Sequence, residues 1–237
     1  MPRIRPSSAP AALAWLCLAL ACSVAPARAA EPREEHRIYL SAGAPWGAPG
    51  AAATFASACG DTTTRDTLWL CFEPARDESL FYGFAAEMYV YAQPGDTLGS
   101  FWDMGRGGAN NGGLIVQFGP DETFPQPQPW SVQGVGTVLY DRTPVSGRAR
   151  FLYARPTGSA AAVRAGQRYV LGRVVIGQKH AGLGGCERPV CIEWHAAKFA
   201  FRASGDESAR LGDSRWVGRG SSAADCRARI PAWRPRQ

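Results

Sequence analysis

Two residues in the last long apolar run could carry out acid–base chemistry. Glu193 and His195 are two positions apart, so in a β-strand their side chains point to the same side. A carboxylate beside an imidazole can orient a general base. The chain has no Gly-x-Ser-x-Gly segment that would supply a nucleophile, and its Gly-x-Gly-Ser stretch begins at Gly218, near the end. We therefore interpret the pair as polar residues on the solvent face of a strand.

The glycine-rich segment from Asp103 to Gly113 could bind an ion or an anion. Asp103, Asn110 and Asn111 offer oxygens of the kind that calcium prefers. Their spacing matches neither an EF-hand nor a nonapeptide calcium loop, and no Gly-Lys-Ser/Thr follows the glycines, as a phosphate loop requires. We expect a connection between strands, with no metal ion and no cofactor, and we keep these three residues as binding candidates.

Tryptophans in or beside the expected loops could bind a carbohydrate or a protein. Trp46, Trp102 and Trp130 are the strongest candidates, and Trp216 and Trp233 lie in similar surroundings. An exposed indole can stack on a sugar ring or fill a pocket in a partner. The alternative is that these side chains cover the ends of a hydrophobic core.

Five cysteines follow position 30, and their pairing is open. Two pairs chosen from five cysteines can form in about fifteen ways. Proximity in the sequence favours Cys59–Cys71 and Cys186–Cys191, and a rival pairing joins Cys71 to Cys191. Cys226 is then unpaired or links two chains into a covalent dimer. The spacing fits neither a redox pair nor a zinc site.

The first 29 residues have the three parts of a secretory signal peptide. Arg3 and Arg5 precede a short apolar run, and a small-x-small end follows at Ala27-Arg-Ala29. We expect export to the periplasm or beyond the cell, where disulfides are the usual state of cysteine. Lipid attachment at Cys22 is a minor alternative. The apolar run is shorter than a membrane span needs, and no other run of that length follows.

Charge argues against binding to nucleic acid. The formal net charge of +6 falls to +3 when the three arginines of residues 1–29 are removed. From Leu211 to the end there are six arginines and two aspartates, so the basicity is concentrated in the tail. A nucleic-acid footprint would be spread over one face of the fold. Only two lysines accompany the many arginines, which is typical of proteins from GC-rich bacterial genomes.

The elements that must position these groups are predicted to be strands. Short runs rich in Val, Ile, Tyr, Phe and Trp alternate with clusters of Gly, Pro, Asp and Asn. The expected strands are Arg37–Ser41, Thr67–Glu73, Leu80–Ala92, Leu114–Phe118, Val132–Tyr140, Arg148–Arg155, Arg168–Ile176 and Val190–Arg202. About eight strands with such turns favour an all-β fold of two packed antiparallel sheets, an Ig-like β-sandwich with long loops.

The last expected strand should contain an irregularity. Ile192 and Trp194 share one parity, whereas Phe199 and Phe201 share the other. A strand that keeps its apolar side inward must change phase between them, which predicts a β-bulge or a break at residues 195–197. We assign residues 30–202 to the sandwich and residues 203–237 to an arginine-rich, mostly irregular and loosely attached tail, with one short strand near Ser214–Val217.

Five segments between residues 80 and 201 resemble the cohesin-type and carbohydrate-binding-module-like β-sandwich domains of secreted bacterial proteins. An aromatic strand precedes a Gly-Asp loop, and regular amphipathic strands follow. The segments are Gly83–Tyr91, Pro94–Leu98, Asn110–Val116, Gly147–Phe151 and Ala165–Leu171. The resemblance implies the architecture and a binding role. It carries over no residue that would contact a dockerin, and the proposed disulfides are not part of the usual cohesin pattern.

Two functions remain in competition after these observations. The favoured hypothesis is an exported, non-enzymatic β-sandwich module that binds a carbohydrate or an extracellular protein. The alternative is a secreted hydrolase or sugar-active enzyme with a site in the loops, which needs two carboxylates across a cleft. Its candidate acids are Asp96, Asp103, Asp121 and Glu122.

Overall fold

The computed structural model describes the greater part of the chain after residue 35. The described residues are 36–45, 54–55, 59–119, 125–129, 137–142, 148–201, 205–208, 210–211, 216–219, 226 and 228. They all belong to one compact unit, Glu34–Gln237. The expected signal peptide, Cys22, Trp46, Trp130, Asp121 and Glu122 therefore lie outside the described residues.

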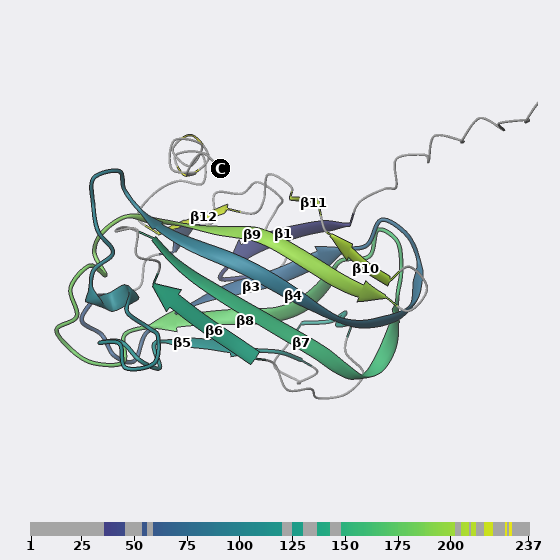
Figure 1. The fold of residues 1–237 in the computed structure, drawn as a ribbon, viewed down its shortest axis with the longest axis horizontal. Helices are drawn as coiled ribbons and strands as arrows, with labels where there is room; N and C mark the ends of the chain where they lie inside the picture. The colour runs from purple at the N-terminus through teal and green to yellow at the C-terminus, as the bar shows by residue number, and fades with distance from the viewer. Residues whose placement is uncertain are drawn as a thin grey trace, which may run out of the picture. The chain divides into compact units, whose positions relative to one another are not determined.

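Two β-sheets make up the described part of the chain (Figure 1). Sheet A has the order β11 (Arg210–Leu211), β1 (Arg37–Ala42), β3 (Arg65–Glu73), β8 (Tyr169–Gly177) and β5 (Leu114–Gln117). Sheet B has the order β2 (Thr54–Phe55), β12 (Trp216–Arg219), β9 (Val190–Phe201), β4 (Glu78–Ala92), β7 (Arg148–Val163) and β6 (Thr137–Arg142), and β10 (Gly205–Ser208) also pairs with β9. The eight expected strands correspond to β1 and β3 to β9.

The pairing is antiparallel apart from two short contacts. Only β1–β11 and β2–β12 are parallel among the described pairs. If the short strands β2, β10, β11 and β12 are left aside, the chain crosses between the sheets after β3, β4, β5, β7 and β8, as in sandwiches built from Greek keys. The prediction of an all-β, two-sheet antiparallel fold is confirmed.

The hydrophobic core lies between the two sheets. Strand β3 contributes Leu68, Leu70 and Phe72, and β4 contributes Met88 and Val90 on the facing side, all with essentially no exposed surface. These residues alternate with others along each strand, which is the pattern that buries one face of a sheet. Burial of each such side chain contributes about 1.5–3 kcal/mol to folding. Every second position of each strand therefore supplies the internal face of its sheet.

Strand β9 contains the predicted β-bulge. Ala196 pairs with Glu87 and Trp194 pairs with Met88, so His195 is an extra residue on β9. This insertion lets both Trp194 and Phe199 point into the core although their parities differ. The prediction from sequence parity is confirmed.

The C-terminal tail is joined to the sandwich, contrary to the expectation of a loose attachment. Strand β12 pairs with β9, from Trp216 opposite Glu193 to Arg219 opposite Val190. The expected short strand near Ser214–Val217 is thus present, shifted by two residues. Strands β10 and β11 were not expected, because Gly205–Ser208 and Arg210–Leu211 are polar or very short and pair only as edges of existing sheets.

The disulfides differ from the expected pairs. Cys59 is bonded to Cys186 and Cys191 to Cys226, with sequence separations of 127 and 35 residues. The predictions of Cys59–Cys71, Cys186–Cys191 and Cys71–Cys191 are wrong, as is that of an unpaired or intermolecular Cys226. Proximity along the chain failed because the fold brings distant segments within the 4.4–6.8 Å between Cα atoms that a disulfide needs.

Cys71 is the free thiol of the described residues. Its side chain is buried on the outer side of sheet A with Tyr39, Trp69 and Val170, and its Sγ lies 3.0 Å from the carbonyl oxygen of Pro45. Burial raises the pKa of the Cys71 thiol well above its usual range. The thiol is therefore protonated and enclosed, which suits a structural cysteine.

Candidate functional site

The glycine-rich loop is organised around a buried asparagine. Asn110 has no exposed surface, and its Nδ2 donates hydrogen bonds to the carbonyl oxygens of Phe101 and Gly177 at 2.8 and 2.9 Å. Its Oδ1 accepts a hydrogen bond from the backbone N–H of Lys179 at 2.8 Å. Asn110 thus links three segments of backbone, and its amide is committed to the fold instead of to a ligand.

Asp103 and Asn111 flank this buried amide. The Oδ2 atom of Asp103 accepts a hydrogen bond from the N–H of Ala109 at 3.2 Å. Gly108 lies so close that an added Cβ would be 2.3 Å from the Asp103 carbonyl oxygen, so this position requires glycine. Asn111 is exposed. The three residues are close in the loop, but of the two asparagine side chains only that of Asn111 faces solvent.

Trp102 is part of the core and is not an exposed stacking surface. It is 1 % exposed, its ring lies edge-on to Phe101 with centroids 5.1 Å apart, and its carbonyl oxygen accepts a hydrogen bond from the Tyr140 hydroxyl. The short 3₁₀ helix η1 (Ser100–Trp102) turns the indole inward. The prediction that Trp102 binds a ligand on the surface is therefore wrong, and the alternative, that it covers the core, holds.

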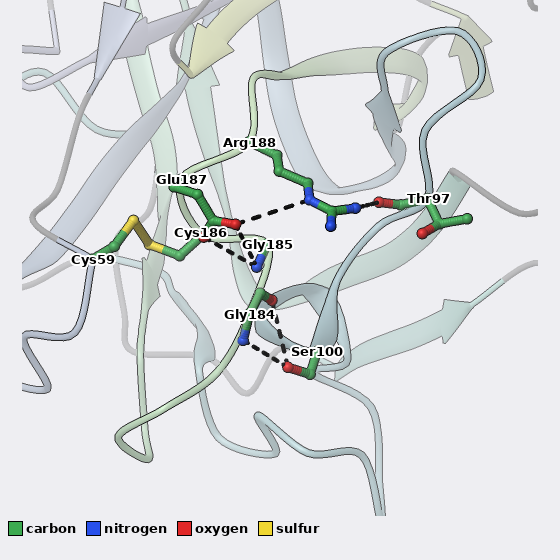
Figure 2. Close-up of polar contacts among 8 residues, drawn as sticks. All are labelled: Cys59, Thr97, Ser100, Gly184, Gly185, Cys186, Glu187 and Arg188. Atoms are coloured by element: carbon green, nitrogen blue, oxygen red, sulfur yellow. Dashed lines mark hydrogen bonds and ion pairs between the residues drawn. A yellow bond between two sulfur atoms is a disulfide. The ribbon is translucent and has the colours of Figure 1, made fainter.

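The loop from Gln178 to Pro189 is fastened to the same end of the sandwich (Figure 2). Gly184 N donates to Ser100 Oγ at 2.9 Å, and Arg188 Nη1 donates to the carbonyl oxygen of Thr97 at 3.3 Å. The Cys59–Cys186 disulfide joins this loop to a third segment. A Cβ on Gly99 would lie 2.3 Å from the Gly184 carbonyl oxygen, so the two backbones touch directly. Hydrogen bonds, a disulfide and a direct backbone contact therefore hold the loops together at this end of the sandwich.

A different arrangement lies on the outer face of sheet B, the face directed away from the core. Asp141 on β6 is opposite Arg150 on β7, and Arg150 is opposite Tyr89 on β4. Arg150 Nη2 lies 3.2 Å from Asp141 Oδ2, and Arg150 Nη1 lies 3.5 Å from Glu87 Oε1. The Tyr89 hydroxyl donates to Glu87 Oε1 at 2.6 Å. We call Asp141, Arg150, Glu87 and Tyr89 the charged row.

The charged row is ordered and accessible at the same time. The side chains of Asp141, Arg150 and Glu87 are 48 %, 33 % and 25 % exposed. Partial desolvation acts to lower the pKa of Arg150, but the negative groups around it, Glu87 foremost, raise it overall. Lys198 and Ala85, which are opposite one another on β9 and β4, continue the exposed surface. We call the exposed surface formed by Asp141, Arg150, Glu87, Ala85 and Lys198 the open half of the face.

The other half of the face is covered. Positions 88–92 of β4 and 190–194 of β9 are buried on both sides of the sheet, whereas exposed positions recur in the rest of each strand. Tyr89 and Tyr91 cluster there with the disulfide-bonded Cys191 and Cys226, on the side opposite the core. The tail, which is held by the Cys191–Cys226 disulfide, therefore shields this half of the outer face from solvent, and we call it the covered half.

Glu193 and His195 lie in this covered half. Glu193 has no exposed surface, and its Oε2 accepts a hydrogen bond from the Tyr91 hydroxyl at 2.8 Å. His195 Nδ1 lies 3.4 Å from the same oxygen, and the Tyr89 ring meets the imidazole edge-on at 4.9 Å. The interpretation of an exposed polar pair is wrong for Glu193, since the tail and two tyrosines enclose it.

The remaining sequence candidates contribute little to a common site. Asp96 is exposed in the turn after β4, while Asp103 lies in the glycine-rich loop. Within the described residues, no three or more His, Cys, Asp or Glu side chains gather in a way that could hold a metal ion. In the same part of the chain, no helix is both long enough and apolar enough to cross a membrane.

The comparison with protein-family models and with curated protein sequences finds no match for this chain.

The charged row is a feature that the structure shows and that the sequence did not predict. Its members come from three strands, and no local motif marks them. Only the register of β4, β7 and β6 brings Glu87, Arg150 and Asp141 together.

Proposed function

We propose that the protein is an exported, non-enzymatic β-sandwich module that binds a protein partner on the open half of the outer face of sheet B. The observation that carries the proposal is the charged row, in which Arg150 is held between two carboxylates beside a tyrosine. Arginine is enriched among the residues that dominate protein interfaces, and Tyr89, itself buried, helps to hold Glu87 in place. A side chain already fixed by neighbours loses little conformational entropy on binding.

A protein partner fits this surface better than a carbohydrate. A sheet face is flat and extended, whereas small ligands occupy concave sites. Of the three tryptophans that favoured sugar binding, Trp102 lies in the core, and the other two are outside the described residues. The resemblance to cohesin-type and carbohydrate-binding-module-like domains supports a binding role and does not distinguish between the two partners.

Export is part of the proposal. The signal-like start of the sequence supports it, and so do the two disulfides, because such bonds persist in oxidising compartments and are rare in the cytosol. The destination we propose is the periplasm, the cell surface or the medium.

Site-specific photo-cross-linking tests the proposed surface. A photoreactive amino acid replaces Ala85, which is exposed in the open half opposite Lys198, and in a matched control it replaces Thr97, which is exposed in a loop. We expect a discrete cross-linked protein from position 85 that disappears in Arg150→Glu and is absent from position 97. Equal labelling from both positions, or binding to a glycan array with no protein cross-link, would contradict the proposal.

A further inference from the structure

The chain contains only two asparagines, and they are neighbours in the glycine-rich loop. Asn110 is buried, and its amide holds three segments of backbone together through hydrogen bonds from both of its polar atoms. Asn111 is exposed, and the residue that follows it, Gly112, is exposed as well. The loop therefore places two amides of the same chemical type in opposite surroundings, one enclosed by protein and one open to water.

The backbone nitrogen of Gly112 is accessible to the side chain of Asn111. Asparagine is one of the thermolabile residues of proteins, and a following glycine has no Cβ to crowd the reaction. Apart from the adjoining residues, a Cβ built on Gly112 would approach no atom more closely than the Lys179 side chain, at 4.0 Å. Within the described residues, the N–H of Gly112 donates no hydrogen bond, whereas the N–H of Asn111 donates one to the Gly108 carbonyl oxygen at 3.1 Å.

We propose that Asn111 is a modification site, at which the side-chain amide is lost spontaneously through a ring formed with Gly112. The Gly112 nitrogen attacks Cγ of Asn111 and forms a C–N bond, and Nδ2 leaves as ammonia with the proton that the Gly112 nitrogen gives up. Water then opens the resulting succinimide. Cleavage between the Gly112 nitrogen and Cγ gives aspartate, and cleavage between this nitrogen and the backbone carbonyl carbon gives isoaspartate. No atom is oxidised or reduced, and water is the co-reactant.

Asn110 lacks the conditions that the reaction needs. Its side-chain amide is held by hydrogen bonds to Phe101, Gly177 and Lys179, and the backbone nitrogen that follows it is bonded to Gly108. Reaction there requires local opening of the loop, and the free energy of opening lowers the rate. The inference goes beyond the proposed function and does not depend on it.

Isoaspartate should disturb the loop because it lengthens the backbone by a methylene group between residues 111 and 112. The next residue, Gly113, is tightly packed, since a Cβ there would lie 2.3 Å from Nδ2 of Asn110 and 2.6 Å from the Gly177 carbonyl oxygen. The Gly113 N–H also donates to the Asn110 carbonyl oxygen at 2.8 Å. The longer backbone therefore enters the segment that fixes the buried amide, and it should lower the stability of the protein.

Peptide mapping of the folded protein during storage at mildly alkaline pH tests the site. We expect both aspartate and isoaspartate to accumulate at position 111 while Asn110 keeps its amide. Denaturation should raise the rate at Asn110 at least about tenfold and the rate at Asn111 by less than about tenfold. Aspartate alone at position 111, equal conversion of the two asparagines in the folded protein, or no conversion at either would overturn the proposal.

Two variants test the effect on the loop. Freshly purified Asn111→Asp carries the aspartate product without the longer backbone, so stored wild-type protein rich in isoaspartate should melt at a lower temperature than this variant. Asn111→Gln keeps an amide but places it one bond further from the backbone. Stored in the same way, it should form no isoaspartate and melt as it does when fresh. Equal melting temperatures of the stored wild type and Asn111→Asp, or an equal decline in stored Asn111→Gln, would contradict the effect proposed for isoaspartate.

Discussion

The hydroxyl group of Tyr91 donates a hydrogen bond to Oε2 of Glu193 at 2.8 Å, although both residues stand on the outer face of sheet B. Outer positions of a sandwich normally face water, and a carboxylate there needs no partner. Here Glu193 has no exposed surface because the tail, joined by Cys191–Cys226, covers this half of the face. The face is therefore divided into a covered half that stabilises the fold and an open half that is available to a partner.

Removal of the Glu193 side chain should destabilise the protein. Glu193→Ala leaves the Tyr91 hydroxyl without its acceptor in a site that is 4 % exposed, which we expect to cost about 1–3 kcal/mol. Chemical denaturation measures the change. Lys198→Ala, on the same strand but exposed, is the control and should change the free energy of unfolding by less than about 0.5 kcal/mol. Equal effects of the two substitutions would show that Glu193 is not the buried partner of Tyr91.

Asn110 should be one of the least tolerant positions of the glycine-rich loop. Asn110→Ala leaves two carbonyl oxygens and one N–H group without partners in the interior, and we expect a loss of about 3 kcal/mol or more. Asn111→Ala changes an exposed neighbour and should be nearly neutral. Thermal unfolding of the two variants compares them. A similar, small change in both melting temperatures would contradict the structural role of Asn110.

The two disulfides should open in a fixed order under a mild reductant. Cys59 is exposed, whereas Cys191 and Cys226 are at most 2 % exposed, and thiol–disulfide exchange requires access to a sulfur atom. Timed reduction, alkylation and peptide mass spectrometry should show Cys59 and Cys186 labelled first, by roughly tenfold. Cys71 should be labelled only on unfolding. Early labelling of Cys226 would mean that the tail detaches readily.

Stability should fall at alkaline pH. Burial raises the pKa values of Cys71 and of Tyr39 in the folded protein, so both groups stay protonated when the same groups in the unfolded chain ionise. The unfolded state then binds fewer protons than the folded state, and stability decreases as the pH rises above the ordinary cysteine pKa of 9.0. For Cys71 alone the loss at pH 10.5 is about 2 kcal/mol. Denaturation curves between pH 7 and 10.5 measure it, and Cys71→Ala should flatten the dependence. An unchanged slope in that variant would assign the effect to other groups.

The sequence predicts the strands well because each strand carries its own signal. A continuous apolar run, Leu68–Phe72, marks β3, and in β9 the change of parity between Trp194 and Phe199 predicts the bulge at His195. These patterns are local, since a strand must turn its apolar residues to one side whatever its neighbours are. Fold class therefore follows from short windows of sequence.

The candidate site could not be predicted in the same way because it depends on register. Glu87 is far from the other two along the chain, Asp141 and Arg150 are nine residues apart, and no spacing rule joins the three. The disulfides were missed for the same reason, since Cys59 meets Cys186 only after loops from three segments converge. Trp102 was misassigned because a tryptophan in a loop has the same sequence signature whether η1 turns it inward or outward.

The affinity of the protein cross-linked through position 85 tests the central claim most directly. It is measured for the wild type, for Arg150→Glu and for the charge swap that adds Glu87→Arg. If the open half binds the partner, both variants lose at least about tenfold in affinity, because the swap restores the pair between β7 and β4 but not the charge pattern that the partner meets. Unchanged affinity in Arg150→Glu, or full recovery in the swap, would contradict the account.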